Sequence, residues 1–374
     1  MADIRLDAVT KRFGDFTAVD RVSIDFRENS VTCLLGPSGC GKTTLMRIIA
    51  GLETPSEGRV LFGDRDVTAL LPRKRDIGMV FQYPVMYPTL TVAENVELPL
   101  KHIREVDAAE RRRRVDEVLE LLGLDVRRNA LIDELDSGSR QKVAVGRAIA
   151  RQCEIVLFDE PTTNVEVNAK LQLIRAFKEI SRRLKQTIVY VTHDQTEAMT
   201  LADRIALMND GVIQQADAPR ALYNHPETPF GGWFLGNPGM NFAEVAVEPG
   251  QREVALPFVA VPVALPAANV RQLTVGVRPE QLRVHETPVP GSVPARVVER
   301  SIGIAGQYLI KLAVGPEDTL IKAKVPAALG RRLGDAAHLE CPPERLALFA
   351  DGVRVAAPDA STAPPAAASS KTGS

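Results

Sequence analysis

The stretch GPSGCGKTT at residues 36–44 constrains the fold more than any other part of the sequence. It fits the pattern G-x-x-x-x-G-K-[ST], in which glycines let backbone amides turn toward phosphate groups. A strand-like run, SVTCLLG at 30–36, precedes it, and a helical pattern, TTLMRIIAGLE at 43–53, follows it. Because a helix N-terminus adds a positive dipole end, this strand–loop–helix unit predicts a phosphate-binding site in an α/β domain.

The whole loop is expected to surround the phosphates of a nucleotide. Its residues are Gly36, Pro37, Ser38, Gly39, Cys40, Gly41, Lys42, Thr43 and Thr44. Lys42 would reach the outer phosphates, and Thr43 would offer its hydroxyl to Mg²⁺. The flanking strand and helix make an incidental glycine-rich turn a poor alternative.

A second motif, IVLFDE at 155–160, brings two carboxylates to the end of an apolar strand. Ligands of α/β proteins bind at that edge of the sheet. We predict that Asp159 is a partner of Mg²⁺ and that Glu160 is the general base for an attacking water molecule. Together with the phosphate loop, this carboxylate pair predicts a site of nucleotide hydrolysis.

The sequence predicts two domains and a tail. Short β-branched runs alternate with amphipathic stretches over 1–235, which predicts an α/β domain with a largely parallel sheet and a helical insert at about 88–150. From 236 to 355, proline, valine, alanine and glycine dominate short strand-like runs, which predicts an all-β domain. The stretch 356–374 has almost no large apolar side chain and is expected to be disordered.

Charge and apolar patterning argue against several classes of protein. The 46 basic and 47 acidic side chains give a formal charge of −1, so no basic character favours nucleic acid. No stretch approaches an uncharged span of about 20 residues, and the N-terminus lacks a signal-peptide core, so we expect a cytoplasmic protein. The cysteines form no CxxC pair and are interpreted as reduced thiols.

The order of these motifs resembles the ATP-binding cassette (ABC) ATPases over residues 3 to about 235. The motifs are the phosphate loop, FQ at 81–82, a glycine-containing segment before a helix at 135–142, VLFDEP at 156–161 and VTHD at 191–194. The resemblance implies a P-loop NTPase cassette with a helical subdomain, and ATP as its nucleotide.

The resemblance also assigns roles to three residues outside the phosphate loop. Phe13 would stack on adenine, although a core position in the first strand is the alternative. Gln82 would sense Mg²⁺ and the attacking water, so that Thr43, Gln82 and Asp159 form the expected metal site. His193 would lie near the γ-phosphate, and it completes the expected catalytic set with Glu160 and Gln82.

Within that superfamily, the chain is most similar to import ATPases for sugars, polyols and glycerol phosphate. LTVGVRPEQLRV at 273–284 matches a recurrent element of their C-terminal all-β OB-like (TOBE/MOBE) barrel domain, and FLGNPGMNF at 234–242 favours the glycerol or polyol branch. The resemblance implies a peripheral subunit at the cytoplasmic face of the inner or plasma membrane. An ATP-binding protein with a soluble or regulatory role, not coupled to transport, is the alternative.

Such ATPases work as pairs of cassettes that bind two transmembrane permease subunits. An extracytoplasmic solute-binding protein is an indirect partner, and no nucleic-acid partner is expected. The surface after Gln82 would receive helices of the permease subunits. An apolar and aromatic cluster there, Tyr83, Val85, Met86 and Tyr87, suits a contact between a helix and a groove. A buried loop in the helical insert is the alternative.

The signature loop departs from the family pattern of leucine, serine, glycine, glycine and glutamine. The corresponding residues here are Leu135, Asp136, Ser137, Gly138 and Ser139. In the family, this loop donates hydrogen bonds to the nucleotide of the opposite chain. An ionised Asp136 cannot donate a hydrogen bond. At about 4 Å from a phosphate charge, electrostatic repulsion would cost about 4 kcal/mol per charge pair at an effective dielectric near 20, unless the side chain rotates away. We therefore predict a heterodimer with a second cassette, with a homodimer as the alternative.

Overall fold

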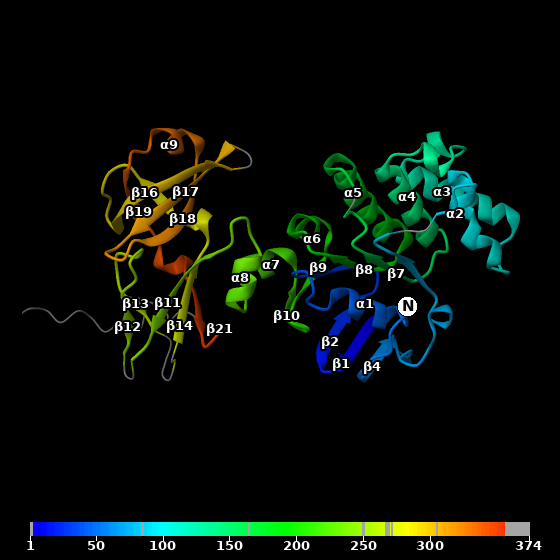
Figure 1. The fold of residues 1–374 in the computed structure, drawn as a ribbon, viewed down its shortest axis with the longest axis horizontal. Coiled ribbons are helices and arrows are strands. Elements are labelled where there is room, and N and C mark those ends of the chain that lie inside the picture. The colour runs from blue at the N-terminus through cyan, green and yellow to red at the C-terminus, as the bar shows by residue number, and fades with distance from the viewer. Residues whose placement is uncertain are drawn as a thin grey trace, which may run out of the picture. The chain divides into compact units, whose positions relative to one another are not determined.

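The computed structural model describes most of the chain. The described residues are 3–83, 86–163, 165–248, 251–265, 270, 272–303 and 306–355. The expected disordered tail, 356–374, and Val85 of the predicted groove lie outside them. The chain divides into two compact units, Met1–Asn224 and His225–Ser374 (Figure 1).

A six-stranded sheet in the order β10-β9-β3-β8-β7-β6 forms the centre of the first unit. Its strands are β3 (Val31–Leu35), β6 (Ile77–Val80), β7 (Ile155–Asp159), β8 (Thr187–Thr192), β9 (Arg204–Asn209) and β10 (Val212–Asp217). All neighbouring pairs are parallel except β9 and β10. Every residue of β3, β7 and β8 is buried, which explains their continuous apolar runs. The predicted α/β fold with a largely parallel sheet is confirmed.

A second, antiparallel sheet in the order β2-β1-β4-β5 packs in the same unit. Its strands are β1 (Ile4–Phe13), β2 (Phe16–Phe26), β4 (Glu57–Phe62) and β5 (Arg65–Asp66). Helix α1 (Lys42–Ala50) lies between the two sheets (Figure 1), and its buried Leu45, Ile48 and Ile49 join one core with residues of both. Burying each such side chain contributes about 1.5–3 kcal/mol. The phosphate loop is therefore anchored on a well-packed helix.

Among its described residues, the first unit has six further α-helices. They are α2 (Val92–Glu97), α3 (Ala108–Leu122), α4 (Ser137–Ile149), α5 (Val167–Leu184), α6 (Gln195–Leu201) and α7 (Pro219–Asn224). Side chains cap the N-termini of α2, α3, α4 and α6. One face of α3 is apolar and buried, and it consists of Val115, Val118, Leu119 and Leu122. Gly123 ends α3 in the left-handed conformation at φ 61°, as its position after the helix predicts.

Short 3₁₀ helices connect several of these elements. They are η1 (Pro72–Lys74), η2 (Leu98–His102), η3 (Asp125–Arg127), η4 (Ile132–Glu134), η5 (Pro279–Gln281) and η7 (Pro343–Arg345). Each helix in the described part of the chain is too short or too polar to cross a bilayer.

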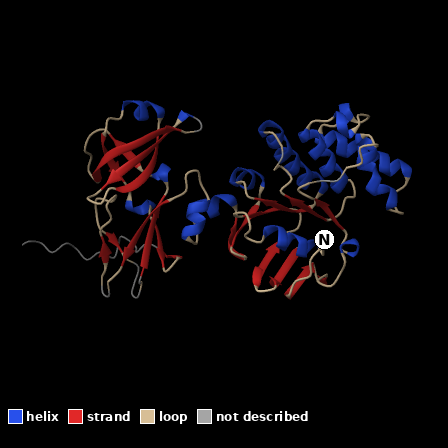
Figure 2. Cartoon of the chain, in the orientation of Figure 1, coloured by secondary structure: helices blue, strands red, loops and turns tan. Residues whose placement is uncertain are grey.

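The second unit consists mainly of antiparallel strands (Figure 2). One sheet has the order β11-β14-β20-β21, another β15-β19-β16-β17-β18, and β12 pairs with β13. The strands are β11 (Asn241–Ala246), β12 (Glu253–Val254), β13 (Val263–Ala264), β14 (Gln272–Val277), β15 (Arg283–His285), β16 (Ser292–Ile302), β17 (Tyr308–Val314), β18 (Thr319–Val325), β19 (Ala336–Glu340), β20 (Ala347–Ala350) and β21 (Val353–Val355). Helices α8 (Pro229–Phe234) and α9 (Ala327–Arg332) complete the unit. One apolar core includes residues of all three sheets, which confirms the predicted β-rich domain.

The division between the units falls earlier than the 235/236 boundary expected from composition. Helix α8 belongs to the second unit, because the buried Arg278 guanidinium at the end of β14 donates to the carbonyl oxygens of Gly232 (2.9 Å) and Leu235. A buried arginine needs such partners. The contact spans 46 positions of the chain, so composition alone could not reveal it.

Candidate functional site

The phosphate loop connects β3 to α1 at the edge where the parallel strands end. Gly39 and Gly41 have positive φ angles, 83° and 102°. A Cβ on Gly41 would lie 2.3 Å from the carbonyl oxygen of Ala18, so both its conformation and its surroundings require glycine. The loop thus has the backbone that the G-x-x-x-x-G-K-[ST] pattern predicts.

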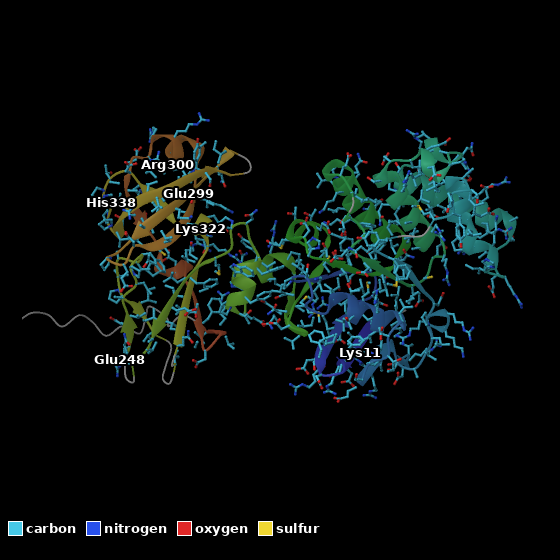
Figure 3. The ribbon with its side chains drawn as sticks, viewed as in Figure 1. Lys11, Glu248, Glu299, Arg300, Lys322 and His338 are labelled. Carbon is cyan, nitrogen blue, oxygen red and sulfur yellow. The ribbon has the colours of Figure 1, made fainter. Side chains whose placement is uncertain are left out.

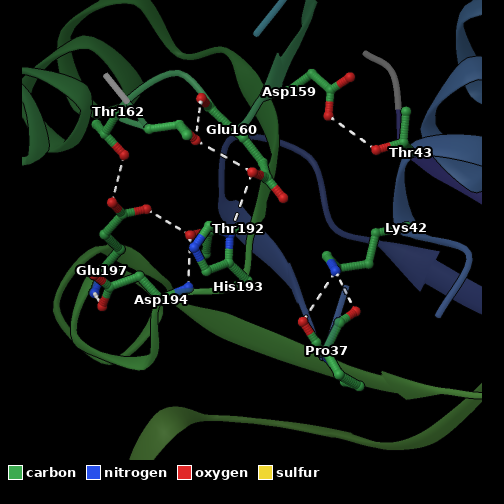
Figure 4. A network of polar contacts seen from close by, with 12 residues as sticks. Pro37, Lys42, Thr43, Asp159, Glu160, Thr162, Thr192, His193, Asp194 and Glu197 are labelled. Atoms are coloured by element: carbon green, nitrogen blue, oxygen red, sulfur yellow. Dashed lines mark hydrogen bonds and ion pairs between the residues drawn. The ribbon is translucent and has the colours of Figure 1, made fainter. Parts of the chain in front are cut away.

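Lys42 is held inside this loop (Figure 4). Its Nζ donates to the carbonyl oxygens of Gly36 at 2.9 Å and Pro37 at 2.8 Å, and the residue is only 4% exposed. The Cys40 Sγ lies 3.7 Å from the same ammonium. Phosphate oxygens make stronger, charge-assisted hydrogen bonds than these neutral acceptors. The ammonium is therefore placed to exchange carbonyl partners for phosphate.

Thr43 and Asp159 meet across the space between α1 and β7. Thr43 Oγ1 donates to Asp159 Oδ1 at 3.3 Å (Figure 4). Burial raises the pKa of the Asp159 carboxyl, and the hydrogen bond from Thr43 opposes that shift. No group of three or more His, Cys, Asp or Glu side chains that could hold a metal occurs among the described residues. A hydroxyl and one carboxylate nevertheless fit Mg²⁺, which takes oxygen ligands and uses few carboxylates when it binds beside phosphates.

Glu160 and His193 form the next pair along the same edge. His193 Nδ1 lies 3.2 Å from Glu160 Oε2, and Thr163 Oγ1 donates to that carboxylate oxygen at 3.2 Å. Glu160 has a φ of 45°, a conformation that costs a residue with a side chain about 1–3 kcal/mol. Its backbone NH donates to the carbonyl oxygen of Val191 at 3.0 Å, which fixes the turn after β7. The carboxylate is thus held beside the imidazole at the end of the sheet.

Eight of the predicted site residues line one cavity of about 330 Å³. Its lining residues are Phe16, Ala18, Ser38, Gly39, Gly41, Lys42, Thr43, Thr44, Gln82 and Glu160. The structure therefore brings Gln82 and Glu160, which are far apart in the sequence, to the mouth of the phosphate loop. Polar groups converging on such a concave surface are typical of a binding site.

The aromatic side chain that lines this cavity is Phe16, which the sequence analysis missed. Phe13 pairs with Phe16 across the β1–β2 hairpin, and its ring centroid lies 4.9 Å from the ammonium of Lys11. Phe13 is 48% exposed, so the alternative of a core position is wrong. The sequence signal for Phe16 is its spacing from Phe13 across the two-residue turn Gly14–Asp15.

The signature residues lie at the start of α4, outside this cavity. Asp136 is the N-cap of α4: its Oδ1 accepts from the Ser139 amide at 2.8 Å and its Oδ2 from the Ser139 hydroxyl at 3.0 Å. The amide hydrogen bond lowers the pKa of the Asp136 carboxyl. Gly138 is buried, and a Cβ there would lie 2.8 Å from the Ala169 Cβ, whereas Ser137 is exposed. The carboxylate is therefore directed onto its own helix.

Comparisons with known proteins identify the family. Residues 19–163 match the family described as ABC transporter, and residues 275–349 match the TOBE domain. The chain is 37% identical over 356 residues to the osmoprotective compounds uptake ATP-binding protein of Synechocystis sp., covering 93% of this chain and 98% of that protein. The chain belongs to the ABC transporter ATP-binding proteins. It is an ABC transporter ATPase that energises solute import.

Other members of the family are similar over much of the chain. The trehalose/maltose import ATP-binding protein of Thermococcus litoralis is 40% identical, with 84% of this chain and 89% of that protein covered. The sn-glycerol-3-phosphate import ATP-binding protein of Chromobacterium violaceum is 43% identical, with 76% and 78% covered.

Solved structures match the first unit. The dimeric structure of a bacterial ABC transporter cassette has a TM-score of 0.52 and 32% identity, and the match covers 58% of this chain and 99% of that one. A post-hydrolysis state of the same cassette, bound to ADP and Pi, has a TM-score of 0.51 and 30% identity, with 58% and 99% covered. ABC ATPases dimerise and couple to permease subunits, so this ATPase belongs to a larger assembly.

Proposed function

We propose that this ABC ATPase drives uptake of a small polyhydroxylated solute, namely a sugar, a polyol, glycerol or glycerol phosphate. The convergence of Lys42, Thr43, Asp159 and Glu160 at one sheet edge carries the hydrolytic part of the proposal. The names of the trehalose/maltose and sn-glycerol-3-phosphate import relatives support the solute class. The shared chemistry of these solutes is a dense set of hydroxyl groups.

Each residue of the site has a proposed role in hydrolysis. The phosphate-loop amides and Lys42 bind the phosphates, while Phe13 stacks on adenine beside Phe16. Thr43, Gln82 and Asp159 would hold Mg²⁺, which when bound neutralises charge on the phosphate oxygens. Glu160 accepts a proton from the attacking water at its carboxylate, and His193 keeps that carboxylate oriented through the 3.2 Å contact.

The solute class can be tested in the assembled transporter. The chain would be reconstituted in proteoliposomes with the permease subunits and the solute-binding protein encoded beside it. We expect one polyhydroxylated solute to raise ATP turnover at least about fivefold. Glycerol, sn-glycerol-3-phosphate and maltose are the compounds to compare, with betaine as a solute that lacks hydroxyl groups. Stimulation by betaine alone would contradict the proposed solute class, and turnover that ignores every solute would contradict the importer assignment.

This chain has a groove beside its helical region that is a candidate docking site for the permease subunits. A cavity of about 300 Å³ is lined by residues that include Phe81, Pro99 and Arg147. Phe81 is half-exposed, and the Arg147 guanidinium lies 5.2 Å from the centroid of the half-exposed Tyr87 ring. This apolar and aromatic surface suits a short helix from a permease, which would place the chain peripherally at the cytoplasmic face of the membrane.

The charged surface gives no support to a nucleic-acid partner. Arginine side chains of α3 are paired: Arg113 and Arg114 each contact Glu110 at 2.7 Å. In the second unit, Lys311 pairs with Glu299 at 2.7 Å on the five-stranded sheet, where Glu299 is labelled in Figure 3. Nucleic-acid readers need clustered, uncompensated positive charge.

The signature loop supports a heterodimer as the working form. Asp136 and Ser139 are bonded to one another, so the carboxylate accepts and the hydroxyl donates within the same chain. Ser137 is the exposed hydroxyl of the loop. A loop with an anionic N-cap and one outward hydroxyl offers a weaker site for the partner's γ-phosphate, so a second cassette with a regular signature is the better partner.

Dimerisation measured by light scattering tests this arrangement. We expect the Glu160→Gln chain with ATP to remain monomeric alone and to form a dimer with a second cassette encoded beside it. The double variant Glu160→Gln/Asp136→Ser should dimerise alone, because a serine hydroxyl can donate to phosphate. ATP-dependent dimers of the single Glu160→Gln variant would instead favour a homodimer with a working signature loop.

A further inference from the structure

A buried carboxylate lies behind the catalytic pair. Glu197 of α6 is 2% exposed and accepts hydrogen bonds from three side-chain hydroxyls as well as contacting an ammonium. The donors are Thr162 Oγ1, Tyr190 OH at 3.0 Å, Thr192 Oγ1 at 2.6 Å and Lys170 Nζ at 2.6 Å (Figure 4 shows Thr162, Thr192 and Glu197). An ionised carboxylate at such a depth is tolerated only with this degree of compensation.

The donors come from the segments that carry the two catalytic side chains. Thr162 lies in the turn directly after Glu160, and Thr192 is the last residue of β8, immediately before His193. One carboxylate of α6 therefore holds both segments. The contact between Thr162 and Glu197 spans 35 positions, whereas that between Thr192 and Glu197 spans five.

The segment of His193 has further contacts through Asp194. Asp194 caps α6 by accepting from the amides of Thr196 at 2.7 Å and Glu197 at 3.2 Å. Lys170 of α5 contacts Asp194 Oδ2 and Glu197 Oε1, each at 2.6 Å, so one ammonium compensates both carboxylates. His193 itself makes none of these contacts and is half-exposed, which leaves its ring to face Glu160.

We propose that Glu197 is a positioning residue for ATP hydrolysis, because it sets the distance between the segment of Glu160 and the segment of His193. The inference rests on the roles proposed above for Glu160 and His193. Loss of the link through Thr162 would leave the turn after Glu160 joined to β8 by the Glu160 NH bond to Val191 but no longer to α6. The Glu160 carboxylate could then shift relative to His193, and a displacement of about 1 Å in a catalytic group can cost about 10²-fold in rate. Binding of the phosphates by Lys42 and Thr43 would be unaffected, since neither contacts Glu197.

A purely structural role makes a different prediction, because every donor would then be equivalent. Thr162 and Tyr190 each supply one hydroxyl to the carboxylate, but Tyr190 lies within β8 and packs against Phe158 and Phe177. Removing either hydroxyl leaves the carboxylate with one donor fewer. The Tyr190 hydroxyl also lies 3.3 Å from Thr162 Oγ1, so removal at Thr162 ends both side-chain links of the segment after Glu160, whereas removal at Tyr190 leaves the link from Thr162 to Glu197 in place.

The test compares these two hydroxyls in the full-length chain assembled with its partners. We expect Thr162→Val to lower kcat for ATP about tenfold with KM within about twofold, and Thr162→Ser to restore kcat. The kcat of Tyr190→Phe should stay at least about fivefold above the kcat of Thr162→Val. Glu197→Gln should lower kcat by up to about 10²-fold. Its matched control is Glu179→Gln, the same change at a partly exposed, ion-paired glutamate of α5.

A second readout does not depend on turnover. The imidazole NMR signal of His193, identified by its loss in His193→Gln, should shift in Thr162→Val and stay in place in Tyr190→Phe. Equal effects of the two hydroxyl deletions, or an effect on KM with kcat unchanged, would overturn the inference. Failure of the unaltered assembly to hydrolyse ATP would refute the proposed function instead, and the NMR comparison would still decide whether Glu197 positions His193.

Discussion

Replacement of Glu160 by glutamine is expected to lower ATP turnover about 10²–10⁴-fold, the usual contribution of a general base. Glutamine keeps the shape of the side chain but cannot accept the proton of the attacking water. The phosphate loop is untouched, so the affinity for ATP should change by less than about twofold. Steady-state phosphate release and equilibrium binding of a fluorescent ATP analogue measure the two effects separately.

The matched control for this variant is Glu28→Gln, the same change at an exposed glutamate between β2 and β3. Its turnover should equal that of the unaltered chain. If Glu160→Gln hydrolyses ATP at more than about a tenth of the unaltered rate, another group must take the proton. His193, 3.2 Å from Glu160, would be the first residue to examine.

Replacement of Lys42 by alanine is expected to weaken ATP binding at least about 10²-fold. Two hydrogen bonds from an ammonium to phosphate oxygens together contribute about 3 kcal/mol to the free energy of binding. Each 1.4 kcal/mol changes the affinity about tenfold. The fold should persist, because Lys42 contacts only loop carbonyls and the Cys40 sulfur. Thermal unfolding with and without ATP measures the effect, since ATP at about 100 times its Kd should stabilise the unaltered chain by about 2.7 kcal/mol.

Lys74→Ala provides the control, because Lys74 is an exposed lysine of η1 away from the loop. Its ATP-dependent rise in Tm should match that of the unaltered chain. A Lys42→Ala chain whose Tm still rises fully with ATP would show that the amides of the loop bind the phosphates without the lysine.

Much of the first unit was predictable because its signals are local. The apolar runs before the phosphate loop and before Asp159 predicted buried parallel strands, and both strands are entirely buried. The antiparallel sheet of β1, β2, β4 and β5 was not separated from the alternating pattern. Its strands share the same β-branched composition, and composition does not specify which strands pair.

The side-chain directions at the site were less predictable. The sequence indicated Phe13 as the aromatic residue of the site, and Phe16, its neighbour across the hairpin, lines the cavity. The sequence left open whether Asp136 would face a phosphate or rotate away, and its carboxylate caps α4. The pattern of a sequence identifies such positions, but the direction of each side chain depends on the packed structure.

Glu197 carried a sequence signal that went unused. It shares the buried face of α6 with Ala198 and Leu201, and a glutamate on an apolar face needs compensating partners. Those partners could not be named from the pattern, because Thr162 and Lys170 come from other elements of the chain.

The sequence by itself determined the strand–loop–helix unit around Lys42, the carboxylates Asp159 and Glu160 at a strand end, and the change from an α/β to a β-rich domain. These features depend on spacing and periodicity within a few turns of chain, where local sterics and burial dominate. Tertiary structure alone decided how Thr162, Lys170 and Glu197 meet. A buried charge takes whichever donors the packed elements bring within hydrogen-bonding distance, and that choice exists only once the chain has folded.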